Sequence, residues 1–214
     1  MTKDLTQGSP ARLILGFALP LLAGIQQLYN LVDTMIVGRF LGVQALAGVG
    51  ATGSINFLVM GFCMGICSGF AIPVAQQFGA REEGRMREFV ANGAWLSIAF
   101  SVVITVLTVV YCRDILLAMN TPEDCLQEAY DYIVVIFAGI PFTFLYNLLS
   151  GYLRSLGDSR TPLYFLILSS VLNVALDLTL ILVFHMGVFG ASLATVISQA
   201  ISGLLCLLFI LLFL

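Results

Sequence analysis

Charged side chains are scarce in this sequence. Only 10% of the 214 residues are Asp, Glu, Lys or Arg, whereas 60% are hydrophobic, and the mean hydropathy is +1.04. A soluble globular domain has roughly 25% charged residues and is about half apolar. Because the apolar residues extend along the whole chain, the composition excludes a water-soluble fold and predicts several membrane-spanning segments.

Basic runs and clusters of reactive side chains are also missing. The formal net charge is −3 and no dense Lys/Arg run occurs, which excludes a nucleic-acid-binding surface. The single histidine, His185, falls at the end of an apolar segment, so no metal or nucleophile cluster of the kind that an enzyme needs is present. The five cysteines lie mostly in apolar runs, which favours packed thiols. We therefore predict a protein that is not an enzyme and needs no cofactor.

Six apolar segments are long enough to cross about 30 Å of hydrocarbon as helices. The predicted spans are residues 11–37, 46–78, 89–111, 129–153, 162–184 and 189–214, after a short cytoplasmic segment, 1–10. Ser9 and Pro10 are a typical start for the first helix, and the residues from Gly157 to Pro162 predict a turn between the fourth and fifth. The expected fold is an all-α integral membrane protein with six transmembrane helices.

The basic residues predict the orientation of these spans. With a cytoplasmic N-terminus, the outer side receives only Arg39 and Arg113, together with an acidic loop at Glu123 and Asp124. The cytoplasmic side then receives the other seven: Lys3, Arg12, Arg81, Arg85, Arg87, Arg154 and Arg160. Since Lys and Arg accumulate at cytoplasmic span ends, we predict that the N-terminus is cytoplasmic.

Two aspartates lie inside the predicted spans, where each costs about 2.5–3.5 kcal/mol at mid-helix. Asp33 belongs to the first span and Asp177 to the fifth. Asp33 shares one helical face with Gln26, Tyr29 and Asn30, which precede it by seven, four and three residues. Such a cost indicates that other polar groups must surround the two carboxyl groups.

Three further spans carry polar residues at a similar depth. Asn173 and Asp177 are four residues apart in the fifth span, Thr195 and Gln199 repeat that spacing in the sixth, and Tyr132 opens the fourth. With the predicted orientation, the outer half of the membrane holds Asp33, Asp177, Tyr132 and Thr195. We therefore predict one buried polar cluster inside a helical bundle.

The chemistry of this cluster suits a monovalent cation. Burial disfavours the charged form of a carboxyl group, so such an aspartate can bind and release a proton. The converging carboxylate, amide and hydroxyl oxygens could instead coordinate Na⁺, and the choice between H⁺ and Na⁺ stays open. The alternative is that both aspartates only hold helices together, which two aspartates with converging partners make the weaker interpretation. Asn56, Asn92 and Asn147 are typical of interhelical hydrogen bonds and receive no role.

Several segments of the chain are similar to one family. They are Ala18-Leu19-Pro20, Gln26 to Asp33, Val37-Gly38-Arg39, Gly42 with Ala45-Leu46-Ala47, Leu153 to Pro162, Asn173 to Asp177, and Gly187 to Thr195. Together they resemble the multidrug and toxic compound extrusion (MATE) transporters, in particular their prokaryotic DinF-like branch.

The resemblance implies a plasma-membrane antiporter that exports amphipathic, often cationic, organic compounds while H⁺ or Na⁺ returns. It implies a fold of twelve spans in two lobes, with the substrate between them and the coupling cation in the N-terminal lobe. The implied cation-site residues are Asp33, Asn173, Asp177, Thr195, Gln26, Tyr29 and Tyr132.

The chain departs from the family because it holds only one lobe. We expect it to be the N-terminal half, which needs a second six-helix lobe from the same gene or from a second copy. The rival function is a lipid-linked saccharide or glycolipid flippase of related architecture. That function predicts basic residues in the cavity to hold pyrophosphate, and no span interior contains Lys or Arg.

Overall fold

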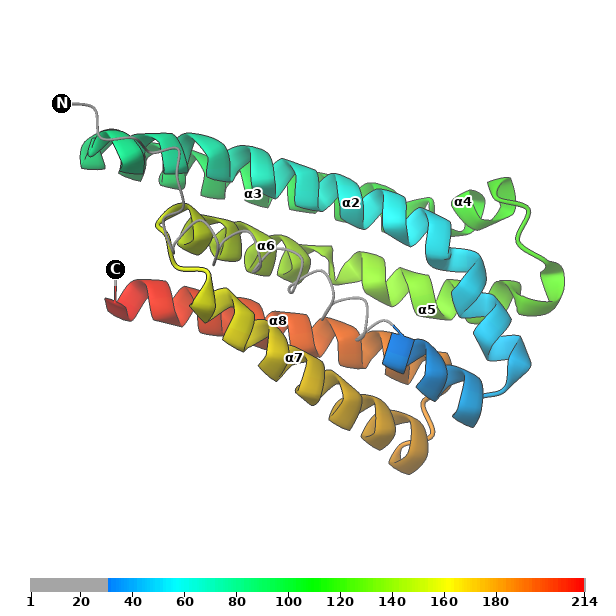
Figure 1. The fold of residues 1–214 in the computed structure, drawn as a ribbon. Helices are drawn as coiled ribbons and strands as arrows, with labels where there is room; N and C mark the ends of the chain where they lie inside the picture. The colour runs from blue at the N-terminus through cyan, green and yellow to red at the C-terminus, as the bar shows by residue number, and fades with distance from the viewer. Residues whose placement is uncertain (1–30, 214) are drawn as a thin grey trace, which may run out of the picture.

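The computed structural model describes residues 31–213, and their regular structure is entirely helical (Figure 1). A helical segment, 31–40, is followed by α2 (Val43–Ala80), α3 (Glu83–Val110), α4 (Cys112–Ala118), the 3₁₀ turn η1 (Glu123–Cys125), α5 (Leu126–Ala138), α6 (Ile140–Ser155), α7 (Arg160–Leu178), the π-helix η2 (Thr179–Val183) and α8 (Gly187–Phe213). The predicted all-α class is confirmed.

Four of the described helices are long and apolar enough to cross a membrane: α2, α3, α7 with η2, and α8. A fifth crossing results if α5 and α6 are counted as one span, because together they pass the same test. Most of the first predicted span, with Ser9, Pro10 and Pro20, lies outside the described residues. The count of six spans therefore stays a prediction.

The fourth predicted span is broken in the middle. Helices α5 and α6 meet at Gly139 with a bend of 47°. Pro141 lies in the first turn of α6, where its missing N–H costs no helical hydrogen bond. A Cβ atom at Gly139 would collide with the side chain of Val196 on α8. The glycine therefore lets α8 pass close to the bend.

The turn from α6 to α7 forms where the sequence predicts it. Gly157 has a φ of +89°, a conformation that glycine adopts without steric cost. Asp158 Oδ1 then accepts hydrogen bonds from the backbone N–H groups of Arg160 and Thr161, both at 3.0 Å. These bonds satisfy two of the free N–H groups at the start of α7.

Small residues bring the helices together. Helix α2 packs against α3, α5 and α6, and α8 packs against α5, α6 and α7. A Cβ atom on Gly48 of α2 would lie 2.8 Å from the Glu128 Cβ atom and 3.0 Å from the Ala129 backbone nitrogen on the α5 side. Inside a membrane such close packing replaces the hydrophobic effect as the force that associates helices.

The two ends of the bundle differ in charge. Arg81, Arg85 and Arg87 lie where α2 ends and α3 begins, and Arg154 and Arg160 lie where α6 ends and α7 begins, at the same end of the bundle (Figure 1). The opposite end holds α4 and η1, with Arg113 and the acidic residues Asp114, Glu123 and Asp124.

This asymmetry predicts the sidedness of the two ends. We expect Glu83→Cys, at the arginine-rich end, to react with a membrane-impermeant maleimide only when the reagent reaches the cytoplasmic face. The matched variant Glu123→Cys should react only from outside, because basic residues accumulate on the cytoplasmic side. Labelling of intact cells and of inverted vesicles measures both, and the five native cysteines, all buried, give the background. The reverse pattern would contradict this orientation.

The close contact at Gly48 predicts that a larger residue at this position destabilises the protein. We expect Gly48→Ala to lower the free energy of unfolding by about 1–3 kcal/mol, because the new methyl group forces α2 and α5 apart. Gly65→Ala is the control, since a Cβ atom there meets nothing within 4 Å. Thermal unfolding of the two purified variants in detergent makes the comparison, and equal melting temperatures would be inconsistent with tight packing at Gly48.

Candidate functional site

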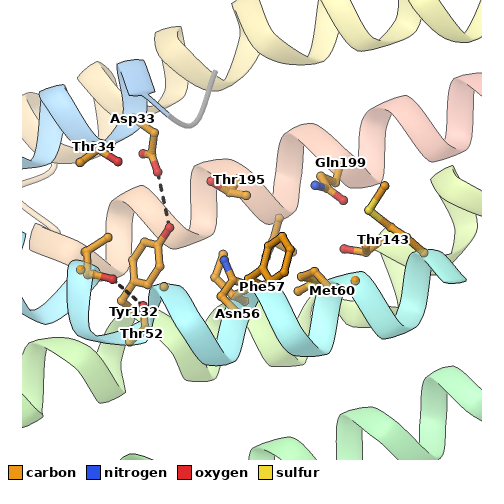
Figure 2. Close-up of a pocket in the computed structure, with 17 residues that line it drawn as sticks. Asp33, Thr34, Thr52, Asn56, Phe57, Met60, Tyr132, Thr143, Thr195 and Gln199 are labelled. Atoms are coloured by element: carbon orange, nitrogen blue, oxygen red, sulfur yellow. Dashed lines mark hydrogen bonds between the residues drawn. The ribbon is translucent and has the colours of Figure 1, made fainter. Parts of the chain in front are cut away.

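Asp33 and Tyr132 meet inside the lobe although 99 residues separate them. Asp33 lies on the helical segment 31–40 with 5% of its surface exposed, and Tyr132 lies on α5 with 6% exposed. The Tyr132 hydroxyl donates a hydrogen bond of 3.4 Å to Asp33 Oδ2 (Figure 2). The bond is long, so it orients the carboxyl group more than it neutralises it.

Helix α7 brings the second carboxyl group to the same place. Asn173 and Asp177 are both completely buried, one helical turn apart. The carboxyl groups of Asp177 and Asp33 lie within hydrogen-bonding reach of each other. Asn173 Nδ2 donates to Thr195 Oγ1 on α8 at 3.3 Å. Five of the seven predicted site residues therefore lie together, while Gln26 and Tyr29 fall outside the described residues.

Two carboxyl groups at this separation cannot both carry a charge. At about 3 Å and an effective dielectric constant of about 20, two unit charges repel each other by about 5 kcal/mol. The pair is stable in this packing only when one of the two groups is protonated or their charge is otherwise compensated. Asp33 Oδ1 is buried and accepts no hydrogen bond from residues 31–213.

The α-helix that carries Asp177 changes to a π-helix two residues further on. The π-helix η2 begins at Thr179, and the Phe184 N–H reaches the Thr179 carbonyl oxygen at 3.2 Å, five residues back. His185 then adopts a φ of +54° and lies exposed at the end of this segment. Single π-turns of this kind occur frequently beside functional sites.

A cavity of about 570 Å³ opens beside the carboxyl pair. Segment 31–40, α2, α5, α6 and α8 form its walls. Asp33 and Tyr132 lie at one end, and Thr195 lies between them and Gln199 (Figure 2). Phe57, Met60 and Met64 supply apolar surface on α2. Among the residues that the structure describes, no Lys or Arg lines this cavity.

Sequence reasoning missed one whole wall of the cavity. Thr52, Asn56, Met60 and Met64 follow one another at intervals of four residues on one face of α2. This spacing was a usable signal, but α2 is apolar on every side, so the face does not stand out. Gln199, four residues after Thr195, also lines the cavity, and the buried Asn56 Oδ1 and Gln199 Oε1 accept no hydrogen bond from the described chain.

Known proteins match both the sequence and the fold. The probable multidrug resistance protein YoeA of Bacillus subtilis is 37% identical over 200 residues, which are 91% of this chain and 43% of that protein. The DNA damage-inducible protein F of Escherichia coli is 28% identical over 86% of this chain and 40% of its own length. The outward-facing structure of a multidrug resistance MATE family transporter of the MOP superfamily superimposes with a TM-score of 0.85 at 26% identity, over 96% of this chain and 46% of that one.

The chain therefore spans less than half the length of these relatives. The family model MatE matches residues 23–179, which include Asp33, Tyr132, Asn173 and Asp177. On this match, the chain belongs to the MatE family of multidrug and toxic compound extrusion transporters.

Proposed function

We propose that this chain is the cation-coupling lobe of an antiporter that exports amphipathic, often cationic, organic compounds across the plasma membrane in exchange for H⁺ or Na⁺. The observation that carries the proposal is the buried Asp33–Asp177 pair, in which Asp33 lines a large cavity. The names of similar proteins, which include multidrug resistance and multidrug export proteins, support the same function.

The coupling follows from the charge of the pair. When a proton or Na⁺ lies between Asp33 and Asp177, the helical segment 31–40 can rest against α7. When the cation leaves, the repulsion between the carboxylates favours a state in which the two elements separate. A cationic compound in the cavity stabilises the charged carboxylates, so that each ligand weakens the binding of the other. Exchange of drug for cation is the consequence of this linkage.

The cavity suits the proposed substrates. Its volume of about 570 Å³ lies within the range of small-molecule sites, which is about 300–1,000 Å³. Met60 and Met64 adapt to different shapes because methionine is flexible and polarisable. The absence of Lys and Arg from the described lining disfavours the flippase alternative, which needs basic groups for pyrophosphate. A second lobe, from the same gene or a second copy, would cover the open side.

The proposal predicts that export depends on Asp33. We expect Asp33→Asn in the full reading frame to lower cation-driven efflux of ethidium by at least about tenfold. The amide keeps the shape of the side chain, but it neither exchanges a proton nor supplies a negative charge. Efflux is measured in cells under an imposed proton gradient or an imposed sodium gradient, and the gradient that drives the parent identifies the coupling ion. Asp131→Asn, on the same helix as Tyr132 but outside the cavity lining, is the control. Undiminished efflux in Asp33→Asn would refute the proposal.

Removal of the Tyr132 hydroxyl should change the cation dependence of transport. Its hydrogen bond stabilises the cation-free carboxylate of Asp33 by about 0.5–1.5 kcal/mol, because it uses a lone pair that a proton or Na⁺ would otherwise take. Tyr132→Phe should therefore lower the cation concentration for half-maximal transport by about twofold to tenfold. Tyr130→Phe, two residues away and not in the cavity lining, should leave it unchanged. A higher half-maximal concentration in Tyr132→Phe would instead make the phenolic oxygen a ligand of the cation.

A further inference from the structure

A second, smaller cavity of about 70 Å³ adjoins the large one. Parts of α2, α6, α7 and α8 form its walls. Met60, Met64, Thr143 and Gln199 line both cavities, so the two spaces meet at these side chains. The smaller cavity is large enough for several water molecules, since one water molecule needs roughly 10–15 Å³ of cavity volume.

Seven of the ten residues that line the smaller cavity carry a hydroxyl or amide group. The Ser170 hydroxyl donates to the Leu166 carbonyl at 2.9 Å, and the Ser202 hydroxyl donates across to the Phe165 carbonyl at 3.2 Å. Both hydroxyl hydrogens are therefore engaged in hydrogen bonds, whereas the lone pairs of the two oxygens can still accept hydrogen bonds from the cavity. The buried Gln199 Oε1 accepts no bond from residues 31–213. Buried acceptors of this kind are costly unless water or a cation meets them.

The smaller cavity lies between the carboxyl pair and the arginine-rich end of the bundle. On α7, Ser169 comes eight residues before Asp177 and nine after Arg160, which places it about 12 Å from the first and about 14 Å from the second along the helix axis. On α8, Ser202 lies seven residues beyond Thr195, about 10 Å further toward the same end.

One side chain closes the cavity toward that end. Tyr146 of α6 lines the cavity, and its hydroxyl donates a hydrogen bond of 3.2 Å to the Pro162 carbonyl in the first turn of α7. Just beyond it on α6, Arg154 Nη1 donates to the Ser150 hydroxyl at 2.9 Å. The Tyr146–Pro162 bond therefore joins α6 and α7 on the side of the cavity that faces the arginine-rich end.

We propose that the smaller cavity is a hydrated passage through which the coupling cation moves between the Asp33–Asp177 pair and the cytoplasm. The passage lies inside the lobe and meets the large cavity at the four side chains that line both spaces, and the Tyr146–Pro162 hydrogen bond closes it. This proposal rests on the antiporter function and on the orientation proposed above. Serines that only join helices need no open space beside them, whereas these serines line a space that adjoins the cavity lined by Asp33.

The passage is tested by making its wall apolar. The double variant Ser170→Val with Ser202→Val, in the full-length protein in proteoliposomes, should bind ethidium with a Kd within about twofold of the parent. Its ethidium-driven cation flux should fall by at least about tenfold, because the cation loses the water and oxygen atoms that solvate it along the way. Ser202→Thr keeps the hydroxyl and should retain the parent's flux. Ser101→Val, at a buried serine of α3 outside both cavities, is the control.

A second variant tests the closure. Tyr146→Phe loses the bond to Pro162 and should raise the cation leak without ethidium by about threefold or more. A parent-like flux in the valine variant, together with a parent-like leak in Tyr146→Phe, overturns the passage. If Asp33→Asn abolishes the flux in the same vesicles, the antiporter proposal survives that result. If Asp33→Asn also leaves the flux unchanged, the antiporter proposal itself fails.

Discussion

Two carboxyl groups held against each other inside an apolar lobe are the constraint on which the rest of the structure depends. Asp33 and Asp177 come from helices far apart in the sequence, and their mutual repulsion of about 5 kcal/mol exceeds what one interhelical contact supplies. A cation between them removes this repulsion. The proposed coupling therefore rests on how the stability of the packed lobe responds to a cation at this pair.

The large cavity beside Asp33 and the small cavity that adjoins it differ in chemistry, although they share four lining residues. The large cavity presents Phe57 and flexible methionines, and the small one presents serine and amide oxygens. The bend at Gly139 and the π-helix after Asp177 interrupt two helices close to the carboxyl pair. Interrupted helices change shape at lower cost than continuous ones, so these breaks lie where a conformational change linked to the cation has to begin.

The main features of the fold and the centre of the site could be predicted from the sequence because charge is conspicuous in apolar spans. Spacing and predicted topology alone place five polar residues in one group: Asp33, Asp177, Asn173, Thr195 and Tyr132. Asn56 and Asn147 could not be assigned, since an asparagine in a span has the same pattern whether it joins helices or lines a cavity. The short helix α4 is too brief for a hydropathy signal. The roles of all seven site residues stay predictions, and Gln26 and Tyr29 also lie outside the described residues.

The affinity of the full-length protein for a cationic dye, measured at increasing concentrations of the coupling cation, tests the central claim most directly. If the cation and the dye compete through the charge of the carboxyl pair, the Kd for ethidium rises steadily with H⁺ or Na⁺ in the parent, and this dependence disappears in Asp33→Asn. A Kd that is independent of both cations, or a dependence that survives the substitution, would contradict the account.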